Sequence, residues 1–266
     1  MLTLYGKEKI MWELYDALID LVPEDATVAE CLVGYNWTLV RSLATGVALT
    51  PPKEGCSKRS IGPIAGMPVR ALAKKIKSWN SLEATLGLAA INSVLNTPGQ
   101  VERLSGIPLS QHHQMSAFAR FKNEVRGRRV AVIGHFPDLE QITSMCELSI
   151  LERKPHGGDY PDPACEYILA QQDYVFMTAT TIINKTLPRL LELSSRAVKV
   201  LVGPSTPLTA RLHDFGIDVL AGMAVDDEAA FWRTVREAGS LEIFENGGHM
   251  VEIRNKQIRT GHDAAA

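Results

Sequence analysis

The chain of 266 residues has 22% charged and 45% hydrophobic residues and a formal net charge of −2 at pH 7. This length is sufficient for two modest domains with a substantial core. The near-neutral charge gives no electrostatic reason to expect nucleic acid or an anionic membrane as a partner. No apolar run reaches the ~18 residues of a membrane-spanning helix, and the first residues lack a signal-peptide core. These features predict a cytoplasmic protein.

Four cysteines are spread along the chain, and no two of them have C-x-x-C spacing. This spacing excludes zinc-ribbon and thioredoxin-type motifs. Free thiols are the expected state in a reducing compartment, although spacing alone leaves open a metal site assembled from distant cysteines and histidines. The positions are Cys31, Cys56, Cys146 and Cys165.

The first 100 residues predict a small α+β unit. Apolar residues at helical spacing indicate a first helix, which Pro23 ends. Three short strands, an irregular stretch and two helices follow. The expected helices cover 8–22, 69–77 and 81–95, and the expected strands cover 27–33, 37–41 and 45–50. We assign residues 1–110 to this first unit and 111–127 to a connecting segment.

From residue 128 onward, short apolar strands alternate with helices. This pattern is typical of a parallel sheet that is covered on both faces, so residues 128–266 are expected to form a doubly wound α/β domain. Two further strands, 241–245 and 250–254, are expected around Asn246-Gly247-Gly248 as a hairpin or as two edge strands. The other expected strands are 130–133, 148–151, 174–177, 198–202 and 217–220, and the expected helices are 137–146, 164–171, 187–193, 208–215 and 227–238.

The turn after the first of these strands is Gly134-His135-Phe136-Pro137. A dinucleotide-binding turn would carry G-x-G-x-x-G at this place. Asp138 and Glu140 lie where a pyrophosphate would need positive potential. Glu152 lies 18 residues after Gly134, near the position of a ribose-binding acid, but the missing glycines weaken this match. The turn therefore indicates a ligand site without indicating a dinucleotide.

Polar and small residues follow every strand of the second half. Because the carboxyl ends of parallel strands meet at one edge of a sheet, this edge is the expected ligand site. Each feature also has a structural explanation: Thr206 before Pro207, for example, is typical of a helix cap. The expected ligand-binding residues are Gly134, Phe136, Thr178, Thr180, Thr181, Asn184, Pro204, Ser205, Thr206 and Gly222.

The loop 154–166 is rich in side chains that bind metal ions. Carboxylate and imidazole groups are common metal ligands, so His135, Asp159, Asp162 and Glu166 form a candidate metal site. Asp162 could instead cap the following helix, with Pro163 in its first turn and Glu166 pointing back toward the cap.

Several sequence runs resemble one known family. They are Val33-Gly-Tyr-Asn-Trp37, Val130-Ala-Val-Ile-Gly-His-Phe136, Gly158-Asp-Tyr-Pro-Asp-Pro163, Thr178-Ala-Thr-Thr181 and Leu201-Val-Gly-Pro-Ser-Thr-Pro207. The chain resembles the heavy-metal-chelation domain family, which has long been catalogued as a domain of unknown function. The resemblance implies a domain like the N-terminal domain of enolase, followed by a Rossmann-like domain. It also implies a site in the cleft between them and a role with heavy metals or a metal-bearing cofactor. Enolase activity is not implied, because the magnesium-binding barrel is absent.

We therefore expect a two-domain protein that binds a transition or heavy metal ion, or a small metal-binding ligand, in its cleft. His135 is the first candidate for an acid–base group and Glu152 is the second. An alternative is an enzyme that acts on a pterin, a nucleotide or an S-adenosyl compound without a bound metal. A third is a scaffold without chemistry. The sequence identifies neither the metal nor a cofactor, and the protein could form a homo-oligomer.

Overall fold

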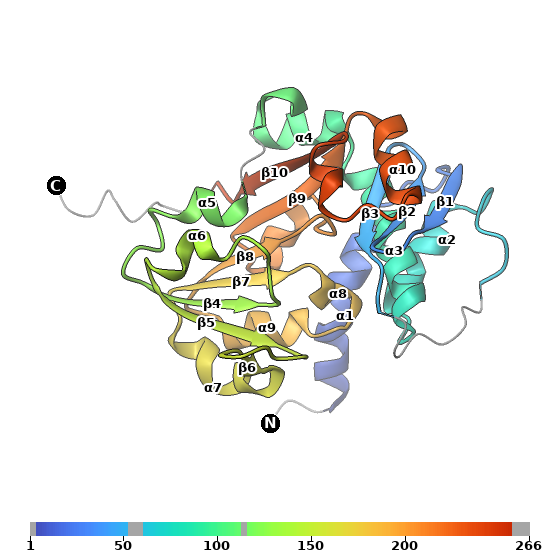
Figure 1. Ribbon diagram of the computed structural model, residues 1–266. Helices are drawn as coiled ribbons and strands as arrows, with labels where there is room; N and C mark the ends of the chain where they lie inside the picture. Colours follow the sequence, from blue (N-terminus) through green and yellow to red (C-terminus); the bar gives the residue numbers. More distant parts are fainter. Residues whose placement is uncertain (1–3, 53–60, 113–115, 257–266) are drawn as a thin grey trace.

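The computed structural model describes residues 4–52, 61–112 and 116–256, with side chains from Trp12 onward. Its strands form a three-stranded sheet in the first half and a seven-stranded sheet in the second (Figure 1). None of the helices in these ranges is both long and apolar enough to cross a lipid bilayer.

The first half follows the predicted order of elements. Helix α1 (Leu4–Asp20) precedes an antiparallel meander of β1 (Glu30–Val33), β2 (Trp37–Arg41) and β3 (Thr45–Leu49). Helix α2 (Val69–Ala73), a 3₁₀ turn (Lys74–Lys77), α3 (Ser81–Leu95) and α4 (Pro98–Ser105) complete it. Helix α3 lies very close to β3, and the lack of a side chain at Gly46 allows this approach. A Cβ on Gly46 would be 2.1 Å from the carbonyl oxygen of Ala89.

The second half contains the predicted parallel sheet. Its strand order is β10-β9-β8-β7-β4-β5-β6, and every neighbouring pair is parallel except β9 and β10. The order reverses between β4 and β7, which is where open α/β sheets place their ligands. The strands are β4 (Arg129–Ile133), β5 (Glu147–Glu152), β6 (Tyr160–Pro161), β7 (Tyr174–Thr178), β8 (Val198–Val202), β9 (Val219–Val225) and β10 (Gly248–Arg254).

Helices cover both faces of this sheet (Figure 1). Along β4, Val130 and Val132 face α5 and α6, whereas Ala131 and Ile133 belong to the core that includes α1, α3 and α9. The helices are α5 (Ala117–Phe121), α6 (Glu140–Thr143), α7 (Cys165–Ile168), α8 (Thr180–Ile183), α9 (Leu187–Leu193) and α10 (Glu228–Arg236).

Three local predictions were wrong. The helix expected over 137–146 is the single turn α6, and the helix expected over 208–215 is 3₁₀ helix from Ala210 to Phe215. The helix expected over 164–171 is present, with α7 at its centre and 3₁₀ turns on either side. The strand expected over 241–245 is also 3₁₀ helix (Leu241–Phe244), so there is no hairpin at Asn246. Strand β10 instead pairs along all of β9. Strand β9 is buried at all seven positions, and pairing with β10 satisfies the backbone groups of its outer edge.

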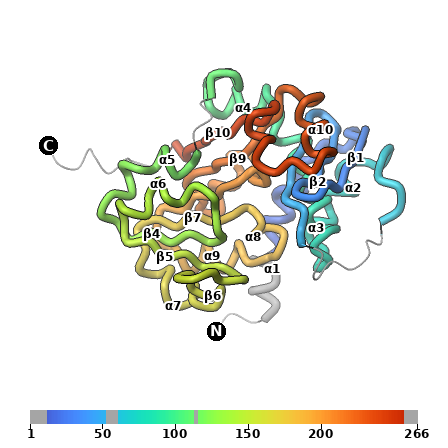
Figure 2. The backbone as a smooth tube through the Cα atoms, in the orientation of Figure 1, coloured from blue at the N-terminus to red at the C-terminus, as the bar shows by residue number. Residues whose placement is uncertain are grey.

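The two halves share a continuous core. Figure 2 shows α1, at the start of the chain, next to α8 of the second half. There the Tyr15 hydroxyl donates to the carbonyl oxygen of Ile182, at 3.1 Å. On the other side of the first half, the Trp232 indole donates to the Thr45 hydroxyl at 2.8 Å. The halves are therefore fixed relative to each other by buried contacts on both sides of the three-stranded sheet.

Two buried asparagines, Asn92 in α3 and Asn96 at its C-cap, make further contacts between the halves. The Asn96 amide nitrogen donates to the carbonyls of Thr206 and Met223, and its oxygen accepts from the backbone of Leu208. The Asn92 amide nitrogen donates to Val47 and to Ser205. All of these carbonyl and N–H groups would otherwise be buried without a partner, which is costly.

We predict that Asn96→Ala lowers the free energy of unfolding by about 3 kcal/mol, because three buried hydrogen bonds are lost and their partners remain unsatisfied. Asn246→Ala is the matched control, since its exposed amide makes one local bond, to Glu242, and it should cost less than about 0.5 kcal/mol. Chemical denaturation measures both values. Equal effects of the two substitutions would contradict the bridging role of Asn96.

Candidate functional site

A cavity of about 780 Å³ lies at the carboxyl ends of β4, β7 and β8. The turn 134–138 and the segments 178–180 and 202–205 form its base. Trp37 and Leu49 contribute from the meander of the first half, and the segment 240–250 contributes from the end of the chain. The cavity therefore lies at the reversal of strand order, and both sheets contribute to it.

Aromatic side chains form much of the wall. Trp37, Phe118, Phe136 and Phe244 all line the cavity, together with Met250. The rings of Phe118 and Phe136 are 5.2 Å apart in an edge-to-face arrangement, which is a favourable geometry for aromatic pairs. These walls suit a flat apolar ligand.

The charged residues that line the cavity are acidic. Asp138, Glu152 and Glu245 are among the lining residues, whereas no described lysine or arginine is. One oxygen of Glu152 accepts from the backbone N–H of Arg153 at 2.7 Å, which orients the carboxylate at the end of β5. A phosphate would meet negative charge here, so the cavity favours a neutral or positively charged ligand.

His135 lines the cavity and contacts a buried carboxylate. Its Nδ1 is 3.3 Å from Oδ2 of Asp159. The Asp159 side chain is only 4% exposed, whereas that of His135 is 45% exposed. The same Asp159 oxygen accepts the backbone N–H of His156 at 3.0 Å.

The four predicted metal ligands do not come together in this structure. His135 and Asp159 are in contact, but Arg153 binds Asp162 at 3.2 Å and Arg189 binds both oxygens of Glu166. The hydrogen bonds from Arg189 lower the pKa of Glu166. In the described ranges no three His, Cys, Asp or Glu side chains are grouped as a metal site. Nor does the Asp162 side chain cap the helix that follows it.

Six of the ten predicted ligand-binding residues line the cavity, and the other four do not. Thr181 is buried and donates to the Thr178 carbonyl, and Asn184 accepts from Thr186. Thr206 is buried, and Gly222 lies within β9, where a Cβ would be 2.7 Å from the Thr206 carbonyl oxygen. The six that line the cavity are Gly134, Phe136, Thr178, Thr180, Pro204 and Ser205.

Most of the aromatic wall has no signal in the sequence. Trp37, Phe118 and Phe244 lie in segments far apart in the chain, and in the sequence each looks like an ordinary core residue. The pairing of β10 with β9 places the segment 240–250 beside the sheet edge, and no local sequence signal predicts this pairing.

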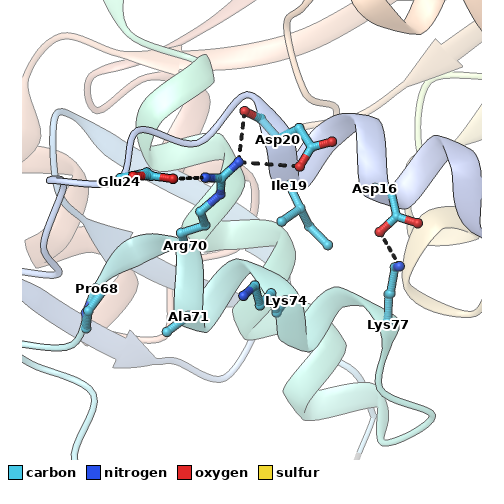
Figure 3. Close-up of a pocket in the computed structure, with 9 residues that line it drawn as sticks. All are labelled: Asp16, Ile19, Asp20, Glu24, Pro68, Arg70, Ala71, Lys74 and Lys77. Carbon is cyan, nitrogen blue, oxygen red and sulfur yellow. Dashed lines mark hydrogen bonds and ion pairs between the residues drawn. The ribbon is translucent and has the colours of Figure 1, made fainter.

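A second groove, of about 760 Å³, lies between α1 and α2 (Figure 3). Its charged side chains are largely paired: Arg70 binds Glu24 at 2.7 Å and Asp20 at 3.3 Å, and Lys77 binds Asp16 (Figure 3). Exposed ion pairs of this kind contribute little energy and commonly tie neighbouring helices together. We therefore place the candidate site in the first cavity.

The described cysteines do not suggest a reactive or metal-binding thiolate. Cys31, Cys146 and Cys165 form no disulfide within the described ranges. Burial raises the pKa of the Cys165 thiol to about 11 and also raises the pKa of Cys146. Both thiols are therefore protonated at neutral pH. Cys56 lies outside the described residues.

Two family models match this chain, and both have the description "Putative heavy-metal chelation". DUF364 matches residues 117–253, and DUF4213 matches residues 15–95. The chain belongs to the DUF364 family. The resemblance inferred from the sequence is thus confirmed, although the family description specifies no reaction.

Two crystal structures of DUF364 proteins have a similar fold, and both proteins are of unknown function. The protein from Desulfitobacterium hafniense DCB-2 is 38% identical, with a TM-score of 0.83 over 93% of this chain and 100% of that chain. The protein from Pyrococcus horikoshii is 25% identical, with a TM-score of 0.73 over 92% of this chain and 100% of that chain. An uncharacterized protein from Methanocaldococcus jannaschii is 29% identical over 225 residues, which are 79% of this chain and 83% of that protein.

In this DUF364 protein, a buried lysine anchors the segment that follows β7. Lys185 has a left-handed backbone, and its ammonium donates to the carbonyls of Ser78 and Ile183. Burial lowers the pKa of Lys185 from 10.5 to about 8. The backbone at Lys185, beyond the end of α8, is therefore held against the first half.

We predict that the Lys185 ammonium makes stability rise with pH between about pH 8 and pH 10. In this window the unfolded chain binds more protons at this lysine than the folded chain does, so the unfolding free energy increases with pH. The unfolding free energy of the wild type minus that of Lys185→Met, taken from denaturation curves, should rise with pH across this window. The same difference for Lys74→Met, a substitution at an exposed lysine, should not change with pH. A difference that stays flat for Lys185→Met would contradict the prediction.

Proposed function

We propose that this protein binds a small, flat, metal-chelating organic ligand in the cavity at the edge of the parallel sheet. The observation that carries the proposal is the cavity itself: it has room for such a ligand, aromatic walls and a few polar groups. The family description supports the involvement of a metal ion.

The arrangement of side chains suggests how the metal would be handled. Because no three protein ligands are grouped in the described ranges, a metal ion bound here would take most of its donors from the organic chelator. The aromatic walls would bind the ring system, and His135 and Glu152 would contact its polar edge. The acidic lining favours a neutral or cationic chelate over a free anionic one.

The architecture suits this function. We propose that residues 1–110 are an enolase N-terminal-like domain and that residues 128–266 are a Rossmann-like domain, joined by 111–127. The separate sheets and the reversal of strand order support this division. The ligand would then bind in the cleft between the domains of a cytoplasmic protein.

Isothermal titration with the equimolar complex of Zn²⁺ and 1,10-phenanthroline tests the proposal. We expect binding at one site, and Phe136→Ala should weaken it by about tenfold, because an aromatic contact is lost. Asp162→Asn and Glu166→Gln are the matched controls and should leave binding unchanged. If Zn²⁺ alone binds tightly and these two substitutions abolish that binding, the metal site formed by four protein ligands is correct and the chelator model is wrong.

A second candidate is an enzyme that acts on a heterocyclic or nucleoside-like molecule without a metal. The observation that favours it is Glu152, fixed by the backbone N–H of Arg153 at the end of β5, beside the Gly134 turn. An acid at the corresponding place in dinucleotide folds binds ribose hydroxyls.

This candidate predicts stabilisation by ligand in the presence of a chelator. With EDTA present, adenosine, S-adenosylmethionine or a pterin should raise the melting temperature of the wild type by binding the native state. Glu152→Gln should abolish the shift caused by a ribonucleoside, whereas Glu147→Gln, at an exposed position of the same strand, should retain it. No shift with any of these compounds would rule the candidate out.

A further inference from the structure

We propose that His135 and Asp159 form a proton-transfer pair that acts on the ligand in the cavity. His135 would exchange the proton, and Asp159 would be a positioning residue that holds the imidazole in one tautomer. The inference rests on the proposed function, since it needs a ligand in the cavity, and it gives Asp159 a role other than metal binding.

The hydrogen bonds of Asp159 determine which nitrogen of His135 carries the proton. An ionised carboxylate can only accept hydrogen bonds. Its Oδ2 accepts the His156 backbone N–H at 3.0 Å and lies 3.3 Å from Nδ1 of His135. Neutral His135 therefore carries its proton on Nδ1, and the lone pair of Nε2 is left for a ligand.

The backbone positions both members of the pair. His135 follows Gly134, whose N–H donates to the Leu151 carbonyl at 2.9 Å and whose φ is +103°. Asp159 directly precedes β6, where Tyr160 pairs with Leu151 of β5. Both side chains are thus fixed relative to the end of the same strand.

The difference in exposure matches the two roles. The Asp159 side chain is 4% exposed and His135 is 45% exposed, and of the two only His135 lines the cavity. Asp159 is therefore shielded from direct contact with a ligand in the cavity, and it can act on the ligand through the imidazole.

The proposed step is a simple transfer of a proton. Nε2 of His135 forms a bond to a proton from an O–H or N–H group of the ligand. The O–H or N–H bond breaks, and its electron pair stays on the ligand. The resulting imidazolium is stabilised by the Asp159 carboxylate, and the reverse transfer restores the starting state. A chelating group must lose its proton before it binds a metal ion, so the step would prepare the ligand for metal binding.

Long-range ¹H–¹⁵N NMR of the histidine rings tests the geometry. We expect the Nδ1–H tautomer for His135 in the wild type and in Asp162→Asn, a control on the same loop whose partner is Arg153. Asp159→Ala should move His135 to the Nε2–H tautomer. An Nε2–H tautomer in the folded wild type, or no change in folded Asp159→Ala, would overturn the proposal.

Proton transfer is tested with 4-nitrocatechol, a flat chelator whose ionised form is yellow. Bound to the wild type and to Asp162→Asn, it should ionise about one pH unit below its midpoint when bound to His135→Gln, because the imidazolium offsets the repulsion between the anion and the acidic lining. Asp159→Ala should lose most of this difference. Equal midpoints for the probe bound to the wild type and to His135→Gln would overturn the inference.

The zinc–phenanthroline complex distinguishes this inference from the proposed function. Its phenanthroline ligand has no O–H or N–H proton to lose, so its binding does not require the proposed proton transfer. If it binds while 4-nitrocatechol does not bind or does not shift, the proton-transfer pair is wrong and the proposed function stands. If neither probe binds, the proposed function itself is contradicted, and the pair with it.

Discussion

The side chains of Asn92 and Asn96 hold the loop after β8 against the first half of the chain, and the shape of the cavity depends on this contact. Asn92 donates to the Ser205 carbonyl, and the Ser205 hydroxyl accepts the backbone N–H of Leu49. Ser205 and Leu49 both line the cavity. These bonds fix the loop after β8 against β3 and α3. The meander of the first half thus acts as one wall of a site whose base belongs to the second half.

The chemistry of the cavity follows from what surrounds each charged group. Arginines bind Asp162 and Glu166 on the outer surface, which leaves these carboxylates unavailable to a metal ion. Asp138, Glu152 and Glu245 line the cavity and form no ion pair with described residues. The acidic lining, the aromatic walls and the contact between His135 and Asp159 are the features from which we propose a site for an organic ligand.

The regular elements could largely be predicted from the sequence, because they depend on local patterns. The α3 boundaries, the parallel strands and the place of the Gly134 turn at the sheet edge all follow from periodicity and turn residues. The lining of the candidate cavity could be predicted only at the strand ends and in the turns directly after them, as at Thr178 and Ser205. Thr181 lies within α8, and its hydroxyl donates to the Thr178 carbonyl instead of facing the cavity. Trp37 and Phe244 line the cavity only because of tertiary packing. Arg189 binds Glu166 from 23 residues away in the sequence. Neither contact has a signal in the local sequence.

The segment 240–250 lines the cavity, and it comes later in the sequence than every other part of the lining. Proteins are synthesised from the N-terminus, and domains fold as they emerge. The meander, α3 and most of the parallel sheet can assemble while β10 is still being made, and the cavity has one side missing during that time. The lining of the cavity is therefore complete only once this segment has been made and β10 has paired with β9.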